Sequence, residues 1–311
     1  MDINGKEFYN AIKKEMTKSV VGNDEVIKLL TVAVLSNGNV LLEGFPGIGK
    51  TIIAKNFAGL FGLDFKRIQL TPDTMPSDIL GFYFYNQKKS DFELRPGPIF
   101  TNILLADEIN RTPPKTQSAL LEAMQEGSIT IDGKYMELPN PFMVIATKNP
   151  LEHEGVYALP EAQMDRFMFK IDILAIDKQD ELEMLNRKQE GTFKNTISII
   201  SERDLRLANI CVKKVKVSPE IMLYIHNIAN ASRNDNRLLY GVSPRASEQL
   251  MMASKALAFV EGRNYVIPDD IKYLFKYVLI HRIKVKLEYE MEGLTGGKIM
   301  EDIINNIEVP K

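Results

Sequence analysis

The residues of this sequence that could do chemistry begin with a glycine-rich loop that ends in Lys50 and Thr51. The stretch GFPGIGKT, residues 44–51, fits the phosphate-loop pattern G-x-x-x-x-G-K-T. Four specified residues occur together by chance in roughly one chain in a hundred of this length. An ordinary glycine turn followed by an accidental Lys-Thr pair is therefore the weaker interpretation.

The residues around this loop predict the context that a phosphate site needs. The apolar centre of residues 39–43 predicts a strand before the loop, and the apolar spacing of residues 52–61 predicts an amphipathic helix after it. Glycines let the backbone turn its N–H groups inward around a β-phosphate at the positive end of that helix. Lys50 would reach the β- and γ-phosphates, and the Thr51 hydroxyl would bind magnesium. The loop predicts a nucleotide site.

Two carboxylates form a second group of candidate residues. Residues 101–106 are largely apolar and run directly into Asp107 and Glu108. Such a run predicts a strand buried on both faces, whose carboxyl end meets the crevice where α/β sheets bind ligands. Asp107 would hold magnesium, and Glu108 would polarise a water for in-line attack on the γ-phosphate. A strand that ends in two acids is common, so the upstream phosphate loop is what makes this interpretation specific.

Two further polar residues are candidates because of their positions. Asn149 ends an apolar stretch at residues 141–148, where its amide could hold the attacking water; a turn residue before Pro150 is the alternative. Arg245 follows Ser243 and Pro244 in the first turn of a predicted helix. A cation there opposes the helix dipole, so a phosphate site explains it better than helix stability does, although exposed first-turn arginines also occur without function.

Three other stretches have open interpretations. Val20 and Val21 precede a turn at Gly22 and could line an adenine pocket or belong to the core. Residues 82–95 predict a hairpin rich in aromatic residues, either covered by the core or inserted to contact a partner. Residues 128–138 alternate about an Asp-Gly tip and predict a second hairpin.

Length and composition set the class of protein. The chain has 311 residues, of which 45% are hydrophobic and 26% charged, which indicates a globular protein of one large or two ordinary domains. No apolar run approaches about 18 residues, so we expect no membrane insertion and a cytoplasmic location. The formal charge of −2 predicts no general affinity for nucleic acid, and the single Cys211 excludes a disulfide within the chain. Strand patterns end near residue 177, and helical patterns follow, with helix starts predicted at Ser201, Ser218 and Ser243.

Taken together, the motifs resemble the MoxR family of AAA+ ATPases over nearly the whole chain. The resemblance implies an α/β fold, a P-loop AAA+ five-stranded parallel sheet with flanking helices and hairpin inserts, in residues 1–177. A smaller all-α lid domain would follow in residues 178–311. The strand that ends at Asn149 would lie between the strand before the phosphate loop and the strand that ends in Asp107. The matching stretches are residues 41–51, 67–81, 95–126, 145–155, 159–167 and 241–246.

The resemblance also implies roles for single residues. Asn149 matches the sensor 1 position, Arg166 the arginine finger that reaches a neighbouring subunit's nucleotide, and Arg245 the sensor 2 position; Arg95 and Arg111 remain alternatives for the finger. The implied catalytic residues are Lys50, Glu108, Asn149, Arg166 and Arg245. The implied magnesium ligands are Thr51 and Asp107. The implied ATP contacts are Val21, Gly22, Gly44, Phe45, Pro46, Gly47, Ile48, Gly49, Lys50, Thr51, Ile52, Asp107 and Arg245.

The finger implies that ATP hydrolysis depends on assembly into a ring, with a hexamer expected. Members of the family are associated with von Willebrand factor A domain proteins, and the resemblance implies a chaperone-like role in their maturation or assembly. Two alternatives stay open. One is a nucleic-acid-remodelling motor, which the mixed charges of Asp132, Lys134 and Glu137 at a hairpin tip disfavour. The other is a nucleotide-gated assembly switch, which an intact Glu108 disfavours.

Overall fold

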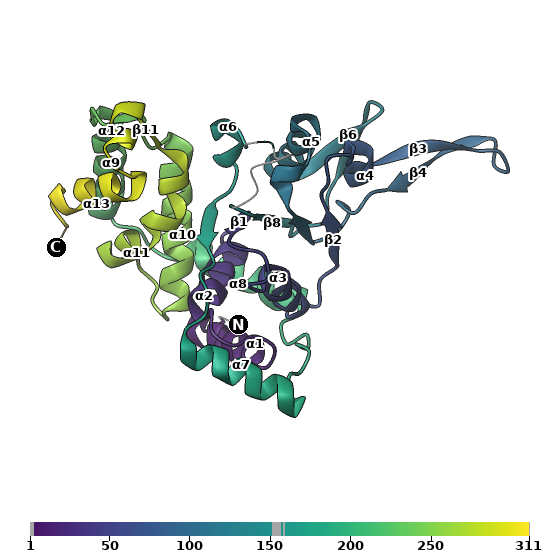
Figure 1. Ribbon diagram of the computed structural model, residues 1–311, viewed down its shortest axis with the longest axis horizontal. Helices are drawn as coiled ribbons and strands as arrows, with labels where there is room; N and C mark the ends of the chain where they lie inside the picture. The colour runs from purple at the N-terminus through teal and green to yellow at the C-terminus, as the bar shows by residue number, and fades with distance from the viewer. Residues whose placement is uncertain (1–2, 151–156, 158, 311) are drawn as a thin grey trace.

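A five-stranded parallel sheet forms the centre of the molecule (Figure 1), in a computed structural model that describes residues 3–150, 157 and 159–310. The end of the stretch 145–155 lies outside these residues. The strands are, in spatial order, β2 (Phe65–Gln69), β5 (Ile103–Asp107), β8 (Met143–Lys148), β1 (Val40–Glu43) and β9 (Phe169–Asp172). Because β8 lies between β5 and β1, the strand order implied by the resemblance is confirmed.

Helices cover both faces of this sheet. Successive strand residues point to opposite faces, so Val40 and Leu42 join one core cluster while Leu41 joins the other. The helices of the first cluster include α1 (Gly5–Met16), α2 (Asp24–Leu35) and α3 (Lys50–Gly59). Those of the second are α4 (Pro76–Leu80), η1 (Ile109–Arg111) and α5 (Pro114–Glu126). The short α6 (Glu161–Met164) precedes β9.

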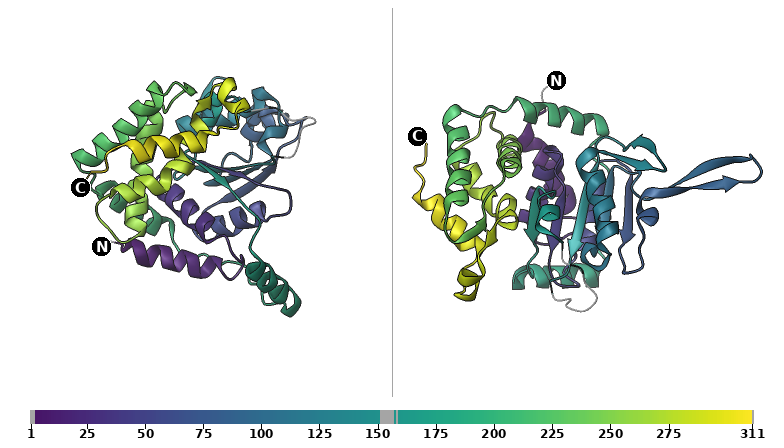
Figure 2. Two further views of the ribbon diagram at one scale, coloured as in Figure 1. Left: turned by 60° about the vertical axis from the view of Figure 1, so that its left-hand side comes forward. Right: turned by 90° about the horizontal axis from the view of Figure 1, so that it is seen from above.

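Two antiparallel hairpins extend from the sheet domain, as the sequence predicts. β6 (Ser128–Ile131) and β7 (Lys134–Glu137) turn at Asp132 and Gly133, both of which have the positive φ that this turn requires. The hairpin of β3 (Gly81–Asn86) and β4 (Asp91–Pro96) projects away from the body of the molecule (Figure 2, right). Tyr85 and Phe92 are 53% and 61% exposed near its tip, so a fully covered hairpin is the wrong interpretation.

The rest of the chain is mostly helical and packs beside the sheet domain (Figure 1). Ser201, Ser218 and Ser243 cap three of these helices through side-chain bonds to backbone N–H groups, which confirms the predicted starts. The elements are α7 (Lys178–Glu190), α8 (Glu202–Lys214), α9 (Pro219–Asn234), α10 (Pro244–Val260), α11 (Pro268–Val278), η2 (Ile280–Arg282), α12 (Leu287–Met291) and α13 (Gly296–Asn306).

This helical part also holds a small sheet that the sequence did not predict. β10 (Leu238–Tyr240) pairs antiparallel with β11 (Lys284–Val285), so the expected lid is not helical throughout. α10 contacts both α1 and α2, and one buried cluster runs from Phe8 to Ile304 through both parts of the chain. The division at residue 177 stays a prediction. No helix in the described part of the chain is long and apolar enough to cross a bilayer.

Candidate nucleotide site

The phosphate loop joins β1 to α3 with an open, glycine-lined backbone. Gly47 and Gly49 have φ of 86° and 91°, a region in which side chains other than glycine are strained. A Cβ atom at either position would meet nothing within 4 Å, so both glycines border open space. Gly44 differs, because a Cβ there would lie 2.4 Å from Ile48 Cδ1. The loop therefore combines one packed glycine with two that leave room for a ligand at the N-terminus of α3.

Lys50 and Thr51 lie in the first turn of α3, where the phosphate-loop pattern requires them. The ammonium of Lys50 donates to the carbonyls of Gly44 and Phe45, which holds the cation over the loop. The hydroxyl of Thr51 donates to Asp107 Oδ2 at 3.1 Å. The loop and the acidic strand end, 56 residues apart in the chain, thus meet through this contact.

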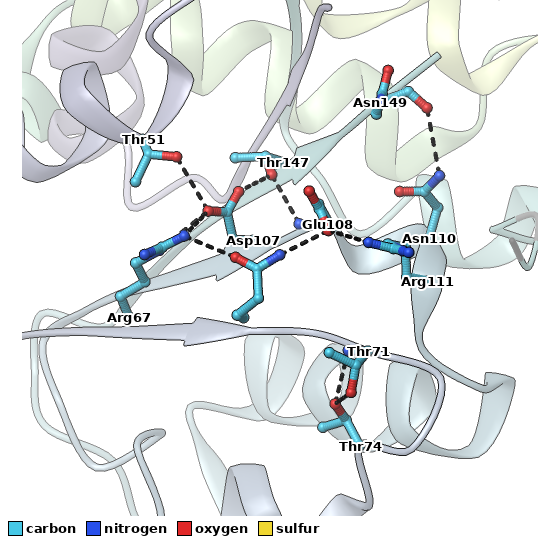
Figure 3. A network of polar contacts seen from close by, with 11 residues as sticks. Thr51, Arg67, Thr71, Thr74, Asp107, Glu108, Asn110, Arg111, Thr147 and Asn149 are labelled. Atoms are coloured by element: carbon cyan, nitrogen blue, oxygen red, sulfur yellow. Dashed lines mark hydrogen bonds and ion pairs between the residues drawn. The ribbon is translucent and has the colours of Figure 1, made fainter. Parts of the chain in front are cut away.

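Asp107 is the buried centre of a polar network (Figure 3). Besides Thr51, its Oδ2 accepts from Arg67 Nη2 at 2.7 Å and from Arg67 Nε at 3.1 Å. Its Oδ1 accepts from the hydroxyl of Thr147 at 2.5 Å. A buried carboxylate needs such donors to offset its desolvation. The sequence did not reveal that Arg67 and Thr147 bond to Asp107, because they belong to other strands.

Glu108 follows Asp107, but its side chain turns to different partners. Its backbone is left-handed, with φ of 59° and ψ of 53°, an uncommon conformation for a residue with a side chain. The hydroxyl of Thr147 accepts from its N–H at 2.9 Å and so stabilises this bend. Its Oε2 accepts from Gln69 Nε2 at 2.7 Å and from Arg111 Nη1 at 3.1 Å (Figure 3). The carboxylates of the two acids therefore have separate partners, while the Thr147 hydroxyl joins the Asp107 side chain to the Glu108 backbone.

Asn149 is buried directly after β8, at the same edge of the sheet as Asp107 and Glu108. Its backbone carbonyl accepts from Asn110 Nδ2 at 3.5 Å (Figure 3). The structure thus brings together five of the sequence-predicted residues: Lys50, Thr51, Asp107, Glu108 and Asn149. This edge presents a cation, a hydroxyl, two carboxylates and an amide around one loop.

A cavity of about 680 Å³ adjoins the phosphate loop on the side of α7. Volumes of this size take a nucleoside-sized ligand. Val20 and Val21 lie in its wall, as do five residues of the loop and α3, which supports the adenine-pocket interpretation of these valines. Its walls include Val20, Val21, Gly47, Gly49, Ile52, Glu181, Met184 and Leu185. The contribution of α7 was not predicted from the sequence.

Gly22 lets α7 approach the cavity. Its φ is 68°, and a Cβ there would lie 2.6 Å from Asp180 Oδ2 in the first turn of α7. The nucleotide contact that the resemblance implies for Gly22 stays a prediction, and the structure places this glycine against the start of α7. Phe45, Pro46, Ile48 and Ile52 lie in or next to the phosphate loop as predicted.

The two predicted arginines occupy different elements. Arg166 lies in the turn after α6, and Arg245 lies in the first turn of α10; both side chains are half-buried. Next to Arg166 in this turn, Asp165 accepts a hydrogen bond at 3.3 Å from the hydroxyl of Ser243, which belongs to the lid. The finger and sensor roles of these residues stay predictions, because both depend on a nucleotide.

The sheet, the phosphate loop and the acidic strand end define a P-loop nucleotide-binding protein with a helical lid. The family model described as ATPase family associated with various cellular activities (AAA) matches residues 39–169, and that of the AAA lid domain matches residues 230–303. The chain is 45% identical over 298 residues to the uncharacterized protein YeaC of Bacillus subtilis, with 96% of this chain and 93% of that protein covered.

Two further comparisons are similarly extensive. The chaperone MoxR1 of Mycobacterium tuberculosis is 39% identical over 307 residues, with 96% of this chain and 81% of that protein covered. The crystal structure of a proposed ATPase from Cytophaga hutchinsonii matches with a TM-score of 0.90 at 40% identity, and covers 99% of this chain and 97% of that one. The chain therefore belongs to the MoxR family of AAA+ ATPases.

Proposed function

We propose that this protein hydrolyses ATP with Mg²⁺ in sites shared between neighbouring copies of a ring, expected to be a hexamer. The observation that carries the proposal is the contact of Thr51 with Asp107, with Glu108 turned away from that pair. This arrangement separates the oxygens that suit a metal ion, on Thr51 and Asp107, from the Glu108 carboxylate, which suits an attacking water. A nucleotide-gated switch needs a metal site but does not need a carboxylate that activates water.

The residues at this edge fit magnesium. The Thr51 hydroxyl and the Asp107 carboxylate, 3.1 Å apart, are the hard oxygen donors that Mg²⁺ prefers. The described residues contain no cluster of three His, Cys, Asp or Glu side chains, and Mg²⁺ normally takes only one or two protein oxygens together with phosphates. When bound, the ion would neutralise charge on the β- and γ-phosphates.

The chain's own residues would then act on the γ-phosphate and the attacking water. In the described part of the chain both side-chain bonds of Glu108 fall on Oε2, which leaves Oε1 to accept from the water. The Asn149 amide would hold the same water from the neighbouring strand end. Lys50, Arg245 and an Arg166 from the next subunit would stabilise the negative charge that develops on the transferred phosphoryl group.

Turnover per chain, measured against protein concentration, tests the shared site. We expect specific activity to rise with concentration, because the finger is supplied only on assembly. Glu108→Gln should retain ATP binding and lose hydrolysis, whereas Lys50→Ala should lose binding as well. Specific activity that stays constant down to concentrations at which the chain is monomeric by sedimentation would contradict the proposal.

We further propose a chaperone-like action on proteins with a von Willebrand factor A domain. The relative named chaperone MoxR1 and the family resemblance support this role. The β3–β4 hairpin offers a contact surface, since Phe84, Tyr85 and Phe92 are all exposed on it. Immobilised Glu108→Gln protein with ATP should retain such a domain, and the triple change of these aromatics to Ser should release it. Retention of single-stranded DNA in a salt-sensitive manner would favour a nucleic-acid motor instead.

A further inference from the structure

Arg282 is a buried arginine at the end of η2, where the lid meets the turn that carries Arg166. Its side chain is 1% exposed. Its Nη2 donates to the Phe167 carbonyl at 2.5 Å and also to Gln249 Oε1, and its Nη1 lies 3.6 Å from Asp165 Oδ1. Buried guanidinium groups are costly unless they are paired and hydrogen-bonded. Arg282 therefore contacts the residues on both sides of Arg166, through a hydrogen bond to Phe167 and an ion pair with Asp165 in which Nη1 makes no hydrogen bond to the described residues.

The partners of Asp165 extend this contact to α10. Asp165 Oδ1 also accepts from the hydroxyl of Ser243 at 3.3 Å. The same hydroxyl accepts from the Ala246 N–H at 3.1 Å and so caps the helix whose first turn carries Arg245. Gln249, which accepts from Arg282, lies one turn further along α10. The turn of residues 165–167 is thus fastened to the start of α10 from two directions.

His281 also lies against the same turn. Its Nε2 is 2.9 Å from the Phe167 carbonyl and 3.2 Å from Arg282 Nε, so the tautomer of the ring decides whether this nitrogen donates to the carbonyl or accepts from the guanidinium. Burial of the ring lowers the pKa of His281 to about 3, with the positive charge of Arg282 as a further cause, so the ring is neutral. Burial also lowers the pKa of Arg282, to about 10, while Asp165 opposes this shift and Arg245 adds to it. The arginine keeps its charge at neutral pH.

We propose that Arg282 is a positioning residue that fixes the Arg166 turn to the lid. The lid of each chain would then position the arginine that this chain supplies to the ATP of the neighbouring chain. The inference rests on the proposed role of Arg166 as a finger supplied in trans. A planar guanidinium holds the Phe167 carbonyl, Gln249 and Asp165 at once, which the single ammonium of lysine cannot do. The prediction is that a defect at Arg282 impairs the neighbouring site and leaves the chain's own site intact.

Mixing of inactive chains tests this prediction. Arg282→Lys should lower turnover at saturating ATP by about tenfold to a hundredfold, as expected when a catalytic group is displaced by roughly 1 Å. Its affinity for a fluorescent ATP analogue should stay within about twofold of the native protein, because its own phosphate loop is unchanged. Mixed with Glu108→Gln chains, which carry an intact finger, it should regain activity. Mixed with Arg166→Ala chains, it should not.

Arg263→Lys is the matched control. Arg263 also belongs to the lid and donates two bonds to Asp270, but it lies beyond the opposite end of α10. Its change should not lower turnover. Asp165→Asn, which removes the carboxylate charge that faces Arg282, is the second variant for the same mixtures and replaces Arg282→Lys if that protein does not fold.

The outcomes separate the inference from the proposed function. If Arg166→Ala regains activity with Glu108→Gln but Arg282→Lys and Asp165→Asn do not, the defect lies in the chain's own site and the positioning role is wrong. Native turnover in Arg282→Lys also overturns it. If the mixture of Arg166→Ala with Glu108→Gln stays inactive, the shared site itself fails, and the positioning role fails with it.

Discussion

Thr147 connects the two acids of the site, and its replacement by valine is the most informative change outside the proposed catalytic residues. Its hydroxyl donates to Asp107 Oδ1 at 2.5 Å and accepts from the Glu108 N–H at 2.9 Å, and the residue is completely buried. Valine has the same shape and suits a strand equally well. Thr147→Val therefore removes both hydrogen bonds without opening a cavity.

The expected cost follows from these two bonds. A hydrogen bond to a charged group contributes about 1.5–3 kcal/mol, and an orphaned buried N–H costs about 1–3 kcal/mol, so we expect about 3 kcal/mol less stability. Turnover should fall at least about tenfold, because the left-handed bend at Glu108 loses the bond that holds it. Thr147→Ser, which keeps the hydroxyl and loses one buried methyl, should cost only about 1 kcal/mol.

Urea unfolding followed by circular dichroism measures both variants, since the chain has no tryptophan to report by fluorescence. Turnover at saturating ATP is measured on the same samples. A Thr147→Val protein whose unfolding free energy and turnover both match those of Thr147→Ser would refute the role assigned to this hydroxyl.

Two other predictions concern the cavity and the lid. Leu185→Asp should weaken binding of a fluorescent ATP analogue about tenfold, because the adenine would lose about 1.4 kcal/mol of apolar contact. Leu182→Asp, on the same helix but outside the cavity wall, should not weaken binding, and equal affinities of the two variants would contradict the adenine assignment. Below pH 6.5 the unfolded chain protonates His281 while the folded chain, with its lowered pKa, does not, so this residue should remove about 2 kcal/mol of stability between pH 7 and pH 5. His281→Gln should reduce that loss in urea unfolding and the exposed His226→Gln should not; a loss unchanged in His281→Gln would contradict the burial argument.

The sequence predicts the elements of this fold well where a local pattern defines them. The phosphate loop, the buried strand before Asp107 and the serine caps of the later helices depend on neighbouring residues, and each lies where it was expected. β10 and β11 were missed because strands of three and two residues carry no periodicity.

The residues that bond to Asp107 and Glu108 could not be predicted from the sequence, for a different reason. Gln69 faces Asp107 through the register of β2 and β5, and Thr147 reaches Asp107 because β5 pairs with β8. Parallel pairing joins residues about 40 positions apart, so no local pattern reveals it. The hydrogen bond from Arg282 to the Phe167 carbonyl likewise joins residues separated by 115 positions.

The supply of Arg166 by a neighbouring chain is the central claim, and complementation tests it most directly. Arg166→Ala and Glu108→Gln should each lose about 10³-fold in turnover alone, as loss of a finger arginine or of the group that orients the water implies. In an equal mixture, about a quarter of the sites combine an intact Glu108 with an intact Arg166 from the next chain, because each is present in half of the subunits. We therefore predict that the mixture regains about a quarter of native activity. A mixture that remains as inactive as its two components would show that the arginine does not act between chains.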